Sequence, residues 1–116
     1  MTESNETISW QDFTKVDMRV GKIIDVQPYP EARNPAYKLW IDFGPEIGER
    51  KSSAQITHHY TPEKLIGKRI VAVVNFPKKQ IGKFMSECLV TGFADEDGHI
   101  ILTTPDADAP LGARLI

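Results

Sequence analysis

Hydrophobic and polar residues alternate most regularly between residues 38 and 43. Leu39, Ile41 and Phe43 fall on one side of an extended chain, with charged or amphipathic residues between them. A period of two residues predicts a β-strand with one face in a core. The glycine- and proline-containing residues 44–48 then predict a turn, and residues 49–56 are predicted to return as the second strand of a hairpin.

Four further stretches have the composition of β-strands. Residues 16–26 contain several β-branched residues, and Gly21 within them is expected to mark a bulge or a tight bend. Residues 69–75 are almost entirely apolar, which predicts a strand buried on both faces. Residues 84–94 and 99–103 are predicted to pair, because the Asp-Gly step between them favours a tight hairpin.

Two short helices are expected. Ser9 is a suitable N-cap for a single helical turn that places Trp10 and Phe13 on one side. Residues 61–67 predict a helix of one to two turns, because Thr61 can cap its start and a proline suits its first position. The glycine at its end can stop it.

The order of these elements predicts the fold class. Three strands, one short helix and then two or three strands match an all-β chain with the OB fold, a five- to six-stranded barrel with the short helix between strands three and four. A small β-sandwich has similar strand counts but does not predict the lone helix. Residues 1–116 are expected to form one domain, with a short N-terminal helical turn and with residues 1–8 frayed.

Charge is distributed unevenly along the chain. Residues 33–83 carry ten Lys and Arg against four Asp and Glu, a balance of +6, and the remaining residues carry four against twelve, a balance of −8. The two sum to the net charge of −2. A basic centre of this kind permits one positive face, although the pI near 5.9 argues against a general nucleic-acid coat protein.

The sequence also bears on the compartment. No apolar stretch approaches the roughly 20 residues that a membrane helix requires. Glu3, Glu6 and Asp12 give the first fifteen residues the wrong charge for a secretory or transit peptide. Cys88 is the only cysteine, so no internal disulfide can form, and it is interpreted as a small core residue. A cytoplasmic location is therefore expected.

The connection after the apolar strand 69–75 is the most informative stretch for function. Lys78, Lys79 and Lys83 lie within six residues and are bracketed by Phe76 and Phe84. Cations and flat rings on a mobile loop suit a polyanion with exposed bases, or an extended peptide. The alternative is a solvated hairpin whose aromatic residues face the core.

An RNA site is the first hypothesis. OB barrels bind single strands or loops across strands two and three, where aromatic side chains stack on bases and cations contact phosphates. As an alternative to stacking on a base, Trp40 packs within the fold or forms a dimer contact. The candidate RNA-binding residues are Tyr37, Lys38, Trp40, Arg50, Lys51, Lys78, Lys79 and Lys83.

A polypeptide groove is the second hypothesis. Flexible apolar side chains accept varied partners, and neighbouring polar groups can bond a guest's main chain. The alternative is that the same apolar residues fill the end of the barrel. The candidate peptide-binding residues are Ser52, Ser53, Gln55, Phe76, Ile81, Phe84 and Met85. Apolar residues near both termini are candidate dimer contacts: Ile8, Trp10, Phe13, Leu111, Leu115 and Ile116.

Catalysis has little support in the sequence. His58 and His59 are adjacent, so in an extended segment they are expected to point to opposite sides and not to share a metal. No spacing of His, Cys, Asp and Glu resembles a zinc or calcium site, and no glycine-rich phosphate loop is present. The chain is therefore predicted not to be an enzyme and to need no metal or cofactor.

Several blocks of the sequence resemble a known family. Asp-Met-Arg-Val-Gly at 17–21 and the passage 65–75 are similar to the EMAP-II-like tRNA-binding domain, the OB module attached to methionyl- and phenylalanyl-tRNA synthetases. Within that family, residues 30–39, 52–57 and 75–77 resemble the free-standing CsaA group. This resemblance implies a homodimeric, export-related chaperone that works with unfolded preproteins and the secretion ATPase SecA, and it also implies tRNA binding.

One block departs from the parent family. Synthetase-linked members tend to read Ser-x-Gly-Met after the strand-four loop, whereas this chain reads Ser86-Glu87-Cys88-Leu89. Glu87 adds negative charge near the expected RNA groove. The leading hypothesis is therefore a CsaA-like chaperone, and the alternative is a structure-selective tRNA-binding protein that uses the same groove.

Overall fold

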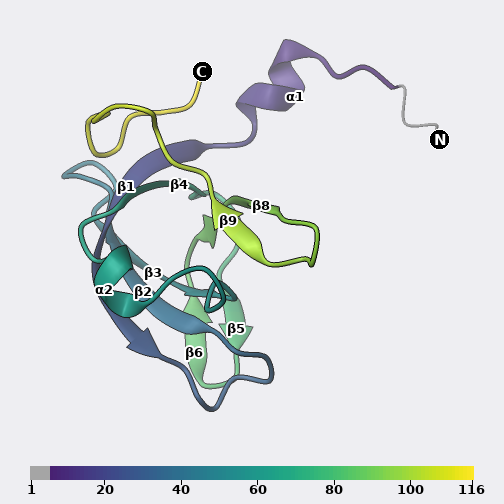
Figure 1. The fold of residues 1–116 in the computed structure, drawn as a ribbon. Helices are drawn as coiled ribbons and strands as arrows, with labels where there is room; N and C mark the ends of the chain where they lie inside the picture. The colour runs from purple at the N-terminus through teal and green to yellow at the C-terminus, as the bar shows by residue number, and fades with distance from the viewer. Residues whose placement is uncertain (1–5) are drawn as a thin grey trace.

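The computed structural model describes residues 6–116 and shows an all-β chain whose main sheet curls into a nearly closed barrel (Figure 1). The sheet has five strands in the order β3-β2-β1-β4-β7. Its strands are β1 (Met18–Pro28), β2 (Tyr37–Asp42), β3 (Glu49–Ala54), β4 (Arg69–Val73) and β7 (Leu89–Val90). A short helix, α2 (Pro62–Leu65), connects β3 to β4. The predicted order of three strands, a helix and further strands is confirmed.

Strand β1 is the centre of the sheet, because it pairs with β2 along its second half and with β4 along its first. Its pairing with β2 shifts between Ile23 and Asp25, so the bulge lies there and not at Gly21. Gly21 pairs regularly with Ile70. A Cβ atom on Gly21 would lie 2.5 Å from the Ile41 side chain, so this glycine makes room for a side chain of the neighbouring strand β2.

The predicted alternation of β2 places its apolar side chains in the core. Leu39, Ile41 and Phe43 are fully buried, as are Ile23 of β1 and Ile70 of β4. Strand β4 is buried on both faces along Ile70–Val73, as its apolar composition predicts. The core therefore lies inside the curl of β1, β2 and β4.

The region predicted as one long strand, 84–94, is divided into three short strands. β5 (Lys79–Ile81) and β6 (Phe84–Ser86) form a hairpin, β7 pairs with β4, and β8 (Gly92–Ala94) pairs with β9 (Ile100–Leu102). The predicted hairpin at the Asp-Gly step is confirmed by β8 and β9, but the prediction of one strand over 84–94 is wrong because each piece pairs with a different partner. Lys79 lies in a paired strand, so the expected mobile loop is an ordered hairpin.

Both predicted helices are present. In α1 (Trp10–Thr14) the Ser9 hydroxyl accepts from the Asp12 amide and the Asp12 carboxylate accepts from the Ser9 amide, a complete capping box. The Trp10 and Phe13 rings lie 5.3 Å apart, as their spacing predicts. In α2, Thr61 occupies the N-cap position without a side-chain hydrogen bond, so its expected capping role is not seen.

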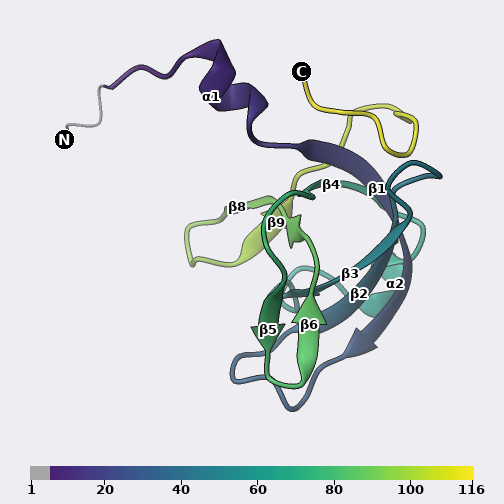
Figure 2. The same ribbon diagram turned by 180° about the vertical axis from the view of Figure 1, so that it is seen from behind.

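Helix α1 leads into the start of β1, and the C-terminal segment lies beside the same end of that strand. Helix α1 has no buried residue and projects away from the barrel (Figures 1 and 2). The C-terminal segment runs beside β1, where the Leu115 amide donates to the Met18 carbonyl at 2.8 Å. Of the N-terminal residues predicted to be frayed, 1–5 lie outside the described residues and 6–8 have no regular structure. No helix within 6–116 is long and apolar enough to cross a membrane.

Candidate functional site

The barrel is incomplete between β3 and β7, the two end strands of the main sheet. Glu87 bridges part of this seam, because its amide donates to the Lys51 carbonyl at 2.8 Å and its carboxylate accepts from the Lys51 amide at 3.1 Å. One residue pair further along, the Ser53 amide donates to the Ser86 hydroxyl at 3.2 Å. The seam is thus joined partly by side chains, without a regular strand ladder.

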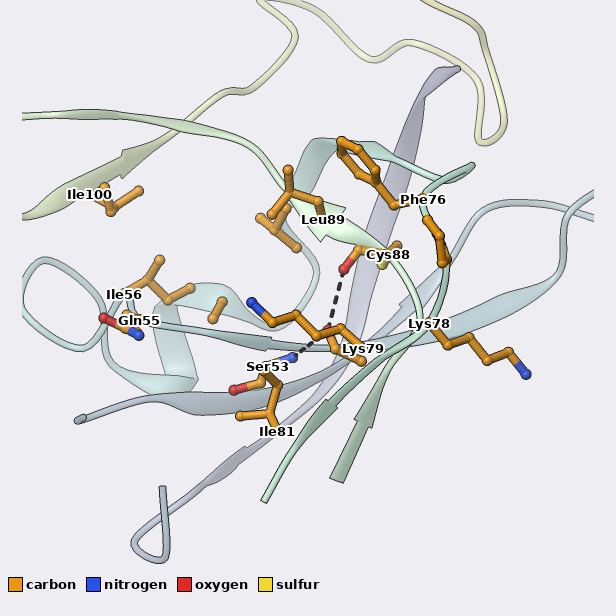
Figure 3. A pocket seen from close by; sticks show the side chains of 14 residues that line it. Ser53, Gln55, Ile56, Phe76, Lys78, Lys79, Ile81, Cys88, Leu89 and Ile100 are labelled. Carbon is orange, nitrogen blue, oxygen red and sulfur yellow. Dashed lines mark hydrogen bonds between the residues drawn. The ribbon is translucent and has the colours of Figure 1, made fainter. Parts of the chain in front are cut away.

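A cleft of about 710 Å³ lies along this seam (Figure 3). Residues from β3 and its extension line one side, residues from the Ser86–Val90 segment and β9 line another, and the connection between β4 and β5 lies over them. The lining residues are Ser53, Ala54, Gln55, Ile56, Phe76, Pro77, Lys78, Lys79, Ile81, Ser86, Cys88, Leu89, Val90 and Ile100.

Local sequence explains why the connection over the cleft leaves the sheet. The Asn75 side chain accepts from the Asp17 amide at 3.0 Å and donates to the Lys15 carbonyl at 2.7 Å, which fixes the chain where β4 ends. Pro77 has no N–H, so it cannot extend the β4 ladder. Phe76 is therefore held at the surface, with 55% of its area exposed.

The cleft is mainly apolar inside. Phe76 and Leu89 are each about half exposed, and Ile56 is buried at its base. Cys88 is also buried, as predicted, and burial raises the pKa of its thiol to about 12. The thiol therefore stays neutral at physiological pH and acts as an apolar surface. An apolar channel with two partly exposed side chains can bind flexible apolar guests.

The two adjacent lysines differ. Lys79 extends over the cleft, whereas Lys78 points away from it (Figure 3). The Lys78 ammonium lies 3.9 Å from a Glu87 carboxylate oxygen, which offsets part of its charge. Of these two lysines, Lys79 alone therefore presents its cation over the apolar interior of the cleft.

Most of the other candidate RNA-binding residues lie outside the cleft. Trp40 packs edge-on against Phe84 at 5.9 Å, and Lys38 and Lys51 lie over aromatic rings beside it. The Tyr37 hydroxyl donates to the Tyr60 carbonyl at 2.8 Å, and Arg50 donates to the Val74 carbonyl at 3.0 Å. Lys83 is exposed in the turn between β5 and β6. The structure thus places Lys38, Trp40 and Lys51 together beside Phe84, with only Lys78 and Lys79 at the cleft.

The peptide-binding candidates are also divided. Ser53, Gln55, Phe76 and Ile81 line the cleft. Ser52 is 2% exposed, and its hydroxyl lies 3.4 Å from that of Ser86. Phe84 is buried in a second apolar cluster with Tyr29 and Ala36, against which Trp40 packs. Met85 is half-buried on β6 and does not line the cleft.

The candidate dimer contacts gather near α1 and the C-terminal segment. Ile8 and Trp10 are 71% and 66% exposed, and Ile116 is 95% exposed. Leu115 is about half exposed, whereas Phe13 and Leu111 are partly buried. This group is separate from the residues that line the cleft.

A histidine cluster was not foreseen. His58 and His99 stack at 3.7 Å, and the rings of His58 and His59 lie 4.8 Å apart, so the prediction that the adjacent pair points to opposite sides is wrong. Residues 57–59 form a turn, which brings the two rings together. The hydrogen bond between His59 and Asp95 lowers the pKa of Asp95 to about 2. Across the described part of the chain, no group of His, Cys, Asp and Glu is arranged to hold a metal ion.

Sequence reasoning also missed several cleft residues. Ile100 comes from β9 and Val90 from β7, and both are far in sequence from Ser53. Their apolar character was visible, but their meeting depends on how the short strands pair. The Asp-Gly step predicts that β8 pairs with β9, but no local signal indicates that β7 pairs with β4.

Comparisons with known proteins agree with this architecture. A family model described as a putative tRNA binding domain matches residues 18–114. The methionine–tRNA ligase of Thermococcus kodakarensis is 34% identical over 110 residues, which are 95% of this chain and 14% of that protein. The chain therefore spans about one-seventh of the length of this relative.

Solved structures of similar size were also found. A crystal structure of chaperone CsaA from Bacillus anthracis has a TM-score of 0.89 and 45% identity, covering 96% of this chain and all of that one. A CsaA chaperone protein from Picrophilus torridus has a TM-score of 0.88 and 51% identity, covering 95% and 100%. A MetRS related protein from Pyrococcus horikoshii has a TM-score of 0.84 and 29% identity, covering 96% and 99%.

Proposed function

The chain belongs to the tRNA-binding domain family, and we propose that it is a non-catalytic, CsaA-like chaperone that holds unfolded polypeptides in the seam cleft. The single observation that carries this proposal is the composition of the cleft. Its surface combines exposed Phe76 and Leu89 with a neutral, buried Cys88. Such a surface gains free energy by covering apolar side chains of many sequences, because the hydrophobic effect is not directional.

The likeness to solved CsaA chaperones supports the same reading, since they match this chain over their full length. Export-bound preproteins as clients, the ATPase SecA as a partner and a homodimeric assembly stay predictions from the family resemblance. The exposed Trp10 and Ile116 are consistent with a covered surface at the α1 end, separate from the cleft.

A second candidate is tRNA binding, which the matching family model and the methionine–tRNA ligase relatives favour. Lys79 over the cleft supplies one cation. Lys38 and Lys51 supply two more but lie beside Phe84, where their ammonium groups pack over aromatic rings. Glu87 lies beside Lys78, and a carboxylate there opposes a phosphate. We therefore place tRNA second.

Two phenylalanines provide a matched test of the proposal. Phe76 lines the cleft and Phe93 does not, yet both are more than half exposed. We expect Phe76→Ser to weaken binding of a labelled, reduced and carboxymethylated unfolded protein about tenfold, as removal of a buried interface aromatic does. Phe93→Ser should leave the affinity unchanged. Fluorescence anisotropy measures both.

Equal affinities of the wild type and Phe76→Ser would exclude the cleft as the polypeptide site. An equal loss in both variants would indicate non-specific adhesion to surface aromatics. Circular dichroism of each variant checks that the barrel is intact.

A further inference from the structure

One edge of β3 pairs with β2. On the opposite edge, the main-chain groups at the end of β3 are not paired with any other described strand. Along this edge Lys51 bonds to Glu87 through both its amide and its carbonyl, and the Ser53 amide bonds to Ser86. Main-chain groups of alternate residues point to the same edge of a strand, so Gln55 is the next position. Neither its amide nor its carbonyl makes a hydrogen bond to any residue in 6–116.

Gln55 lies in the wall of the cleft, and the facing segment belongs to the other end of the sheet. Strand β7 pairs with β4 on one edge only, through Leu89 and Val90. The cleft is therefore bounded by two end strands of one curled sheet. An end strand with uncovered main-chain groups is a template for pairing with another chain.

We propose that a guest polypeptide binds in the cleft as an extended strand, hydrogen-bonded to the main chain of β3 at Gln55. This inference rests on the proposed function and specifies how the ligand is held. The cleft lies along the uncovered edge, so a strand paired there fills the seam that Glu87 closes only in part.

The walls of the cleft suit the side chains of such a strand. Successive side chains of a strand point to opposite faces, so every second residue of the guest would face the apolar surfaces of Phe76 and Leu89. Ile56 and Ile100 supply apolar contacts at the end of the cleft where Gln55 lies. Lys79 extends over the opening and favours guests with acidic residues.

Pairing through the main chain would also allow the cleft to bind polypeptides of many different sequences. Every residue except proline offers the same N–H and C=O groups, so the hydrogen bonds to Gln55 do not depend on the guest's side chains. RNA has no peptide main chain and cannot add a strand. The proposal therefore distinguishes the two ligand classes that the cleft could hold.

The test combines altered guests with altered protein. A series of apolar-acidic peptides, each carrying one N-methylated amide, should show about tenfold weaker binding when the methyl group blocks the paired position, because one hydrogen bond is lost and the strands are pushed apart. Gln55→Pro removes the β3 donor and should weaken binding about tenfold. Gln55→Ala keeps the main-chain donor and removes only the side chain, so it should lose much less affinity than Gln55→Pro does.

Amide hydrogen exchange gives a readout that does not depend on affinity. Exchange at Gln55 should slow at least tenfold when the unmethylated peptide is bound. Peptide binding that is insensitive to N-methylation at every position, with unchanged exchange at Gln55, overturns this inference and leaves the proposed function standing. Failure of every peptide to bind overturns the proposed function as well. Slower exchange at Gln55 with tRNA, and with no peptide, assigns the cleft to RNA and overturns both.

Discussion

The closed side of the barrel and the seam differ in how they are held together. On the closed side, β2 pairs with β3 in continuous register over six residue pairs, and the Leu39 and Ile41 side chains are fully buried. At the seam, β3 bonds to Ser86 and Glu87, which precede β7, and Phe76 and Leu89 are half exposed. Stability therefore comes from the closed side, whereas accessible apolar surface and uncovered main chain are at the seam.

This difference has an energetic basis. Burying a large aliphatic or aromatic side chain contributes about 1.5–3 kcal/mol, so the fully buried residues of the closed side dominate the apolar contribution to folding. A half-exposed side chain such as Phe76 contributes less to folding and keeps surface available for a ligand. The seam therefore contributes less to the free energy of folding than the closed side, and it keeps apolar surface available to a ligand.

The largest expected effect concerns the two phenylalanines that lie on either side of the three lysines in the sequence. Phe84 is 8% exposed and packs against Tyr29 and Trp40, whereas Phe76 is 55% exposed. We expect Phe84→Ala to lower the free energy of unfolding by about 3–5 kcal/mol, as for a core aromatic. Phe76→Ala should lower it by less than about 1 kcal/mol. Urea denaturation followed by circular dichroism measures both.

The comparison would fail if the two variants lost similar stability. A large loss for Phe76→Ala would mean that the seam is part of the folding core. A small loss for Phe84→Ala would mean that the second apolar cluster contributes little to the free energy of folding.

A smaller effect is expected from the lysines. We expect the double variant Lys78→Ala and Lys79→Ala to weaken tRNA binding and to reduce the slope of log K against log salt by about one, because each phosphate contact contributes about one. Most of this change should come from Lys79, since Glu87 lies 3.9 Å from the Lys78 ammonium. Filter binding at several salt concentrations measures the slope.

The matched control is Lys15→Ala with Lys64→Ala, which removes the same charge from exposed positions away from the cleft. An identical slope change in the control would show that tRNA responds to net charge alone. If tRNA binding and its salt slope change in neither double variant, the connection between β4 and β5 is not part of an RNA site.

Much of the fold was predictable because its signals are local. The alternation of Leu39, Ile41 and Phe43 depends only on the two-residue period of a strand, and it places the three residues in the core. The start of α1 depends on Ser9 and Asp12, three residues apart, and their capping box is formed. Such features need no knowledge of the remaining chain.

The failures involve partners that are distant in sequence. Gly21 is predicted at a bulge, but it is required by the closeness of the Ile41 side chain on the neighbouring strand β2. Phe84 was expected in the groove, but Tyr29 and Trp40 cover it. Strand pairing decides which neighbours each of these residues contacts. A stretch of ten residues does not show how the strands pair.

The structure brings part of the predicted site together. Ser53, Gln55, Phe76 and Ile81 line one cleft with Lys78 and Lys79, and their roles in binding a peptide or RNA stay predictions. Of the remaining candidates, Trp40, Lys38 and Lys51 lie beside Phe84. The walls formed by Leu89 and Ile100 were missed, because they depend on the division of 84–94 into separate strands.

Amide chemical-shift mapping with an unfolded polypeptide tests the central claim most directly. If the seam is the binding site, the largest shifts should fall on Gln55, Phe76, Leu89 and Ile100, with small shifts at Trp40 beside Phe84. Shifts concentrated around Trp40 and Lys38, with the seam residues unchanged, would contradict the account.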